Sequence, residues 1–112
     1  MHAQALIQAL RKEAHTQQAD LWSRIAYDLE QPTRQRRVVN ISSISRYTKP
    51  NEVVVVPGKV LGSGNLSHSV VVAAFSFSSS AKERIEQAKG KCMSIPELVK
   101  QNPKGKNIRI IG

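Results

Sequence analysis

The feature that most constrains the fold is an unbroken run of four valines, Val53–Val56. β-branched side chains favour extended backbone, and four apolar residues in a row leave no polar face to turn toward water. Such a run is typical of a strand that is buried on both faces. The sequence therefore predicts a strand here, ended by Pro57-Gly58, with another short extended piece at 59–61.

A glycine-rich segment, Gly58–Gly64, follows the valines, and glycine loops after a strand often bind phosphate. The P-loop pattern of nucleotide-binding enzymes fails because Val53 and Val60 occupy two of its required positions. The dinucleotide-binding pattern fails at Ser67, and a strand-like segment follows where a helix should begin.

Two interpretations of the segment stay open. It binds a backbone phosphate of RNA or DNA through its N–H groups and one cation, or its glycines only supply positive φ in a tight connection between strands. The first interpretation involves Gly58, Lys59, Gly62, Ser63 and Gly64.

The N-terminal third has the periodicity of helices. Leu6, Leu10 and Ala14 recur every four residues, and 22–29 places apolar side chains at i, i+3, i+4 and i+7. A polar interruption at 15–18 separates the two patterns. The sequence predicts two short helices, or one interrupted helix, over about residues 3–30, before Pro32.

The rest of the chain alternates strand and helix signals. Short strands are predicted at 38–39 and 108–111, a second strong strand at Ser69–Phe77, and a helical turn between Ile41 and Ile44. Capping boxes at Ser80–Glu83 and Ser94–Glu97 predict two further helices, with stops at Gly90 and at 102–103.

The predicted fold class is α/β: a small layered domain of irregular strand–strand–helix turns, preceded by N-terminal helices. We expect a single domain over residues 1–112. Its parts are a helical scaffold at 1–31, a basic linker at 32–37 and an α/β core at 38–112.

Charge is strongly segregated along the chain. The net charge is +9, yet residues 1–33 hold three Lys or Arg against four Asp or Glu, and residues 34–112 hold fourteen against four. Such an excess favours a polyanionic partner, because each neutralised phosphate releases condensed counterions. We therefore expect the core and linker to bind nucleic acid, through backbone and shape more than through base edges.

The candidate contacts are cations in loops and linkers, where a rigid core would display them. Arginine forks in the linker can bridge phosphates bidentately. Beyond the glycine-rich segment, the predicted nucleic-acid-binding residues are Arg34, Arg36, Arg37, Arg46, Lys49, Lys104, Lys106 and Arg109.

No catalytic or metal-binding pattern accompanies these cations. There is neither a His-Glu-x-x-His pair nor a Gly-x-Ser-x-Gly elbow, and the three histidines are scattered. His68 is expected to be an exposed turn residue, and Glu52 to stand alone at a strand entrance. We expect no enzymatic activity, cofactor, metal or small-molecule substrate.

Membrane and secretory signals are also missing. No apolar run approaches the roughly 20 residues of a membrane span, and the first residues do not resemble a secretory signal. Cys92 is the only cysteine of the sequence, which excludes an internal disulfide and fits an intracellular setting.

Several motifs resemble a known family, the archaeal and eukaryotic large-subunit ribosomal protein "eighteen-e" family, which is related to the C-terminal part of bacterial ribosomal protein fifteen. The resemblance is to the archaeal branch and covers essentially the whole chain. The motifs are Leu29–Arg34, Val39–Ile41 with Ile44–Tyr47, Val54–Gly64, Val72–Ser78, Ser94–Glu97, Asn102–Gly105 and Ile108–Gly112.

The resemblance implies a cytoplasmic, structural constituent of the large ribosomal subunit. It would bind large-subunit ribosomal RNA, pack RNA segments together beside neighbouring ribosomal proteins, and have no enzymatic activity. The RNA-facing role carries over to the linker at 32–37 and to Gly58–Gly64, and by extension to the other cations named above. An independent RNA- or DNA-binding regulator or nucleoid protein is the alternative, and a nucleotide-using enzyme a third possibility.

Two positions depart from the family pattern. Ala88-Lys-Gly90 stands where relatives often have Ala-Gly-Gly, which adds a cation near a helix end. Ser42-Ser43 stands where relatives often have a basic residue or glycine, so a specific RNA contact at position 43 is not carried over.

Overall fold

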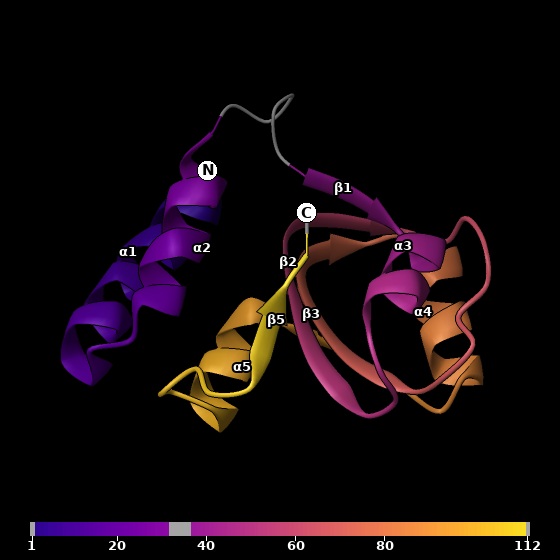
Figure 1. The fold of residues 1–112 in the computed structure, drawn as a ribbon. Coiled ribbons are helices and arrows are strands. Elements are labelled where there is room, and N and C mark those ends of the chain that lie inside the picture. The colour runs from indigo at the N-terminus through magenta and orange to yellow at the C-terminus, as the bar shows by residue number, and fades with distance from the viewer. Residues whose placement is uncertain (1, 32–36, 112) are drawn as a thin grey trace.

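Five helices and five strands occupy residues 2–31 and 37–111, the parts of the chain that this computed structural model describes (Figure 1). Their order is α1 (His2–Gln17), α2 (Asp20–Glu30), β1 (Arg37–Asn40), α3 (Ile41–Tyr47), β2 (Glu52–Leu61), β3 (Val70–Phe77), α4 (Ser79–Gln87), β4 (Lys91–Ser94), α5 (Ile95–Gln101) and β5 (Ile108–Ile110). The predicted α/β class, with helices at the N-terminus, is confirmed.

The strands form one sheet in which every described pairing is parallel. The order is β1-β2-β3-β4, and β5 also pairs with β2. β1 and β5 share one edge of β2: β1 pairs with its end at 58–61 and β5 with its beginning at 53–55. Because the strands run the same way, β2, β3, β4 and β5 begin toward one edge of the sheet, the amino edge, and β1, β2 and β3 end at the opposite, carboxyl edge.

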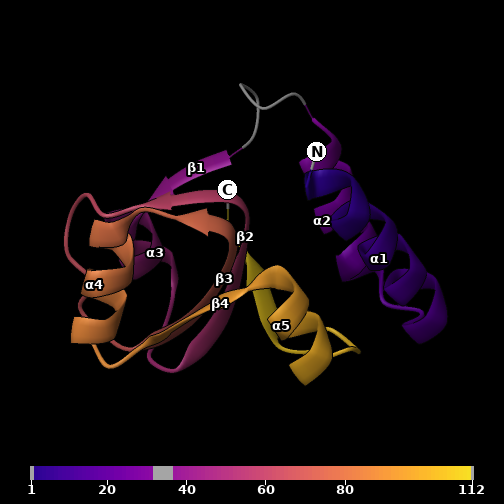
Figure 2. The same ribbon diagram turned by 180° about the vertical axis from the view of Figure 1, so that it is seen from behind.

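The valine run is buried on both faces of the sheet, as its composition predicts. Val54, Val55 and Val56 each have 0% of their surface exposed. Val55 belongs to the hydrophobic core beneath α1, α2 and α5, while Val54 and Val56 belong to the core beneath α3 and α4. Figure 1 and Figure 2 show these two groups of helices on opposite sides of the sheet.

The predicted end of this strand at Pro57-Gly58 is wrong. β2 runs on to Leu61, and Pro57 and Gly58 are buried inside it. The register with β3 shifts between Val56 and Lys59, as at a β-bulge. Proline has no N–H to donate, so the ladder is interrupted locally while the chain continues in the same direction.

The helical scaffold consists of two helices rather than one interrupted helix. α1 ends at Gln17, and Gln18 turns the chain with a φ of 54° before α2 begins. Trp22, Ile25, Ala26 and Leu29 are all buried, as their spacing predicts. Trp22 also donates from Nε1 to the carbonyl oxygen of Pro103 at 2.7 Å, which ties the scaffold to the chain near β5.

Of the two predicted capping boxes, one is confirmed and one is wrong. Ser94 and Glu97 cap each other's backbone N–H groups at the start of α5. At α4 the cap is Ser78, whose Oγ accepts from the N–H of Ala81 at 3.1 Å. Ser80 lies within the first turn instead, because three consecutive serines offer the same cap chemistry in different registers.

Candidate nucleic-acid interface

Sheet pairing joins two of the predicted contact regions. β1 begins at Arg37, the last residue of the basic linker, and Arg37 pairs with Gly58. Val38 pairs with Lys59, and both are exposed. Arg34 and Arg36 lie outside the described residues. The end of the linker therefore runs beside Lys59 at the carboxyl edge of the sheet.

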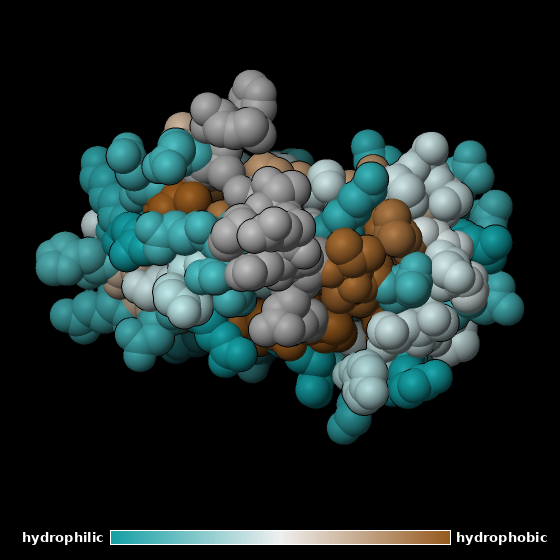
Figure 3. Space-filling model, turned by 90° about the horizontal axis from the view of Figure 1, so that it is seen from above, coloured by the Kyte–Doolittle hydropathy of each residue, from teal (hydrophilic) through white to brown (hydrophobic). Residues whose placement is uncertain are grey.

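This edge also presents hydrophobic surface. Val38 is 60% exposed, and Lys59 pairs on its other side with Ser76, which is exposed too. Figure 3 looks down on the side of the molecule where β1 lies in Figure 1, and it shows hydrophobic surface on this side. Gly58 itself is buried in β2, and the part of the glycine-rich segment that lies outside this strand starts at Gly62.

The connection that begins at Gly62 is not a tight turn. β2 and β3 are parallel, so residues 62–69 must return the chain from one edge of the sheet to the other, and they do so without a helix. They pass along α3 and α4, and the N–H of Ser42 donates to the carbonyl oxygen of Ser63 at 3.2 Å. The alternative of a tight connection between strands is therefore wrong, because residues 62–69 form an extended crossover.

The glycines of the crossover permit this close packing. A Cβ on Gly62 would lie 2.7 Å from the backbone carbon of Ser80, on α4. Gly64 has a φ of +92°, and a Cβ on it would overlap the side chain of Ser42 on α3. Both glycines are thus required by the fold, whatever they contact outside it.

A chain of polar side chains fastens the later part of the crossover to α3. Ser45 and Ser67 join through their hydroxyls at 2.9 Å, and His68 Nε2 lies 2.8 Å from Thr48 Oγ1. Because Thr48 donates its own proton to the carbonyl oxygen of Ile44, Nε2 must carry the hydrogen in this pair. The expectation that His68 is an exposed turn residue is wrong: it is half-buried and hydrogen-bonded.

Arg84 is a cation of this region that sequence reasoning missed. Its Nη1 donates to Asn65 Oδ1 in the crossover at 3.2 Å, and its side chain is exposed on α4. Arg46 is exposed in the last turn of α3, the other helix along which the crossover passes. The helical periodicity around Ala81 and Ile85 places Arg84 outward, but no local signal connects it with a loop earlier in the chain.

Lys104 and Lys106 lie elsewhere. Both are exposed in the loop between α5 and β5, where the Asn102 side chain bonds to the backbone of Lys106. Gly105 between them has a φ of +65° and approaches Leu21 of α2. This loop therefore borders the helical scaffold, away from α3 and α4 (Figure 1).

Glu52 has partners, contrary to expectation. Its carboxylate accepts from the N–H of Lys49 at 2.8 Å and from Arg109 Nε at 2.9 Å. These two hydrogen bonds, the backbone one first, lower the pKa of Glu52 below its ordinary value. Lys49 and Arg109 are both exposed, so two predicted contact residues meet at one carboxylate.

Replacing Glu52 with glutamine should reduce stability at neutral pH and make little difference in strong acid. A carboxylate whose folded pKa is lowered stabilises the fold above its unfolded pKa, near 4.5, and this contribution is lost as the pH falls through the folded pKa. Urea unfolding at neutral and at acid pH measures the difference in free energy of unfolding between the unchanged protein and Glu52→Gln. Glu83→Gln, at an exposed carboxylate on α4, is the control. A difference that persists in acid would contradict the pairing.

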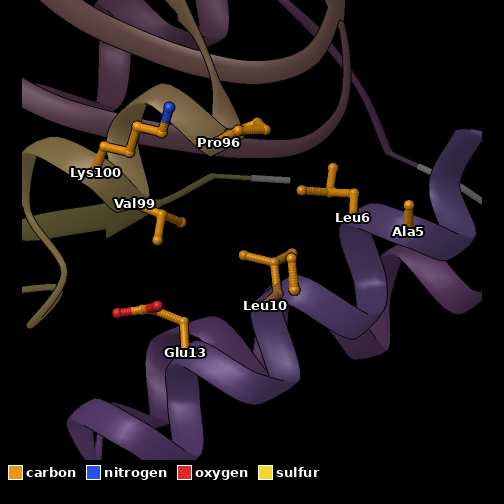
Figure 4. Close-up of a pocket in the computed structure, with 8 residues that line it drawn as sticks. Ala5, Leu6, Leu10, Glu13, Pro96, Val99 and Lys100 are labelled. Carbon is orange, nitrogen blue, oxygen red and sulfur yellow. The ribbon is translucent and has the colours of Figure 1, made fainter.

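An apolar groove lies away from these cations. A groove of about 450 Å³ runs between α1 and α5, lined by side chains that include Leu6, Leu10 and Val99, with Glu13 and Lys100 at its border (Figure 4). No residue of the glycine-rich segment lines it. In the described part of the chain, no group of His, Cys, Asp and Glu is placed to hold a metal ion. Within the same residues, none of the helices has the length and apolarity to cross a bilayer.

Comparison with known proteins identifies the family. The model of the family described as "Ribosomal protein 60S L18 and 50S L18e" matches residues 4–112. The chain is 51% identical to large ribosomal subunit protein eL18 of Methanothermobacter thermautotrophicus, over 95% of this chain and 88% of that protein. It is 49% identical to that of Archaeoglobus fulgidus (95% and 91%) and 53% identical to that of Sulfurisphaera tokodaii (85% and 80%). The resemblance seen in the sequence is confirmed, and the chain belongs to the L18 and L18e family of large-subunit ribosomal proteins.

Proposed function

We propose that this protein is a structural constituent of the archaeal large ribosomal subunit that binds large-subunit ribosomal RNA and has no enzymatic activity. The observation that best supports RNA binding at a particular place is the pairing of Arg37 with Gly58 and of Val38 with Lys59. It aligns the end of the basic linker with the exposed Lys59 at the carboxyl edge of the sheet. Neighbouring ribosomal proteins complete its partners in this proposal.

Contact in this proposal is electrostatic and positional. Arginine side chains of the linker bind phosphates bidentately, and Lys59 adds a point charge beside them. Arg46 and Arg84 extend the basic surface along α3 and α4, next to the crossover at 62–69. The buried sheet beneath fixes the backbone that carries Lys59, so binding there does not have to order that strand.

Reversing the linker charges should test this surface. The triple change of Arg34, Arg36 and Arg37 to glutamate should weaken binding to large-subunit ribosomal RNA on the order of 30-fold and lower the slope of log affinity against log salt by about 2 to 3. Filter binding at several potassium chloride concentrations measures both. The far-UV circular dichroism of the free protein should stay unchanged.

A matched control carries the same change in net charge. Lys12, Arg24 and Lys100 are exposed on α1, α2 and α5, and the same reversal there should weaken binding much less. Equal losses in the two variants would mean that net charge alone governs binding, and the linker would lose its role. Equally tight binding of duplex DNA by the unchanged protein would instead favour an independent nucleic-acid-binding protein.

A further inference from the structure

The turn after α4 holds a lysine in an unusual conformation. Lys89 has a φ of 68°, the left-handed region that favours glycine. The N–H of Lys89 bonds to the carbonyl oxygen of Glu86 at 3.0 Å, and that of Gly90 to the carbonyl oxygen of Ile85 at 2.9 Å. This is the Schellman pattern, in which glycine is the usual residue at the position of Lys89.

Packing explains the next residue but not this lysine. A Cβ on Gly90 would overlap the carbonyl oxygen of Val70 and lie 3.1 Å from Ile85 Cγ2, so the fold requires glycine at position 90. The side chain of Lys89, by contrast, is exposed. A cation at a helix C-terminus gains something from the helix dipole, but Arg84 already places one in the last turn. The strained backbone thus holds a charge that the fold itself does not need.

Lys89 borders a small hollow at the amino edge of the sheet, lined by both apolar and polar residues. The hollow measures about 120 Å³ and lies where β2, β3 and β4 begin. The hollow is larger than the roughly 30 Å³ that one molecule of liquid water occupies, so it has room for a phosphate group. It is lined by Asn51, Ser69, Val70, Val71, Lys89, Gly90 and Lys91.

The groups around the hollow suit an anion. Lys89 and Lys91 are both exposed and both line it, and no carboxylate does. Ser69 donates its hydroxyl to Asn51 Oδ1 at 2.8 Å, which leaves the amide NH₂ of Asn51 as a donor on the other side of that group. Glu52, the acid next to Asn51 in the sequence, accepts hydrogen bonds from Arg109 and from the N–H of Lys49.

We propose that Lys89 and Lys91, with Asn51, bind a backbone phosphate of ribosomal RNA at the amino edge of the sheet. This site rests on the proposed function and adds a second contact, because Lys59 lies toward the carboxyl edge. The strain at Lys89 is then retained because the left-handed turn directs a cation at the phosphate.

The proposal predicts that one variant is more stable than the unchanged protein and yet binds RNA more weakly. Lys89→Gly relieves the backbone strain and should raise the melting temperature by roughly 4 °C. The same change should weaken binding to large-subunit ribosomal RNA from Archaeoglobus fulgidus about threefold and lower the salt slope by about one. In Lys89→Arg the slope of log affinity against log salt should equal that of the unchanged protein. In Lys91→Ala this slope should fall by about as much as in Lys89→Gly.

Gln18→Gly is the matched control. Gln18 also has a positive φ, of 54°, but carries no charge and lies between α1 and α2. This change should raise the melting temperature without altering RNA affinity or its salt slope. It separates relief of strain from loss of a phosphate contact.

Failure of the site and failure of the proposed function give different results. If Lys89→Gly is more stable but binds RNA with an unchanged slope, the site is overturned while ribosomal RNA binding stands. If Lys89→Gly is less stable than the unchanged protein, the argument from strain is wrong. If the unchanged protein does not prefer ribosomal RNA to duplex DNA, the proposed function and this site fall together.

Discussion

Replacing Trp22 with alanine should lower the free energy of unfolding by about 4 kcal/mol. Trp22 is fully buried in the core that α1 and α2 share with α5 and the sheet. Its indole also donates to Pro103, far away in sequence, at 2.7 Å. The substitution removes a large apolar side chain, leaves a cavity and deprives a carbonyl group of its donor. Urea unfolding followed by circular dichroism measures the loss.

Two further variants separate these contributions. Trp22→Phe keeps most of the volume but loses the hydrogen bond, and should cost about 1 to 2 kcal/mol. Tyr27→Ala, at a ring of the same helix that is 62% exposed, should stay within about 0.5 kcal/mol. A cost below 1 kcal/mol for Trp22→Ala would mean that the helical scaffold is not held on the sheet by this residue.

The same substitution should loosen the loop that carries Lys104 and Lys106. Pro103 anchors this loop to Trp22, and Gly105 approaches Leu21 on the same helix. Amide hydrogen exchange in residues 102–107 should therefore accelerate in Trp22→Ala, whereas that of β3 should follow only the global loss of stability. The conformation of the loop that carries these two lysines would then depend on its packing against the helical scaffold, and not on the sheet.

Local sequence patterns predicted the helices and strands of this fold well. The valine run predicted a strand buried on both faces, and the spacing of Trp22, Ile25 and Leu29 predicted a buried helical face. Both rest on the repeat of a regular element, which is visible within a short window. The spacing of Ser94 and Glu97 likewise predicted the start of α5, because a cap acts over three residues.

Long-range pairing was not visible in the sequence. The continuation of β2 past Pro57 depends on β1 and β3, which support the strand on both sides of the bulge. The pairing of Glu52 with Arg109 and the packing of 62–69 on α3 and α4 join segments far apart in the chain. Composition therefore indicated which residues are cationic, but only the fold shows which of them share an edge or already have a partner.

Replacing Gly64 with alanine should destabilise the free protein by about 3 kcal/mol. Two effects add: alanine disfavours a φ of +92°, and its Cβ would overlap the side chain of Ser42. Thermal and urea unfolding measure the total. Gly105→Ala is the matched control, because Gly105 has a φ of +65° but its nearest neighbour is Leu21 Cδ2, at 3.0 Å on a flexible side chain. It should cost only about 1 kcal/mol.

A double-mutant cycle isolates the packing part of this effect. Ser42→Gly removes the side chain that the new Cβ would meet, so adding it to Gly64→Ala should recover about 1 to 2 kcal/mol of the loss. The strain of the positive φ should remain in the double mutant. Additive effects of the two substitutions would contradict the close approach of the crossover to α3.

This cycle also decides between the two interpretations of the glycine-rich segment. A glycine that serves only to let RNA approach would leave the stability of the free protein unchanged when replaced, and would lower RNA affinity alone. A glycine required by the crossover lowers stability first, and the Ser42→Gly partner restores it. In the double mutant Gly64→Ala/Ser42→Gly the new Cβ no longer overlaps the Ser42 side chain. Its RNA affinity therefore shows whether the exposed side of the crossover contacts RNA. Lost affinity in that double mutant would make Gly64 a contact with RNA as well as with α3, and retained affinity would leave contact at this end of the sheet to Lys59 and the linker.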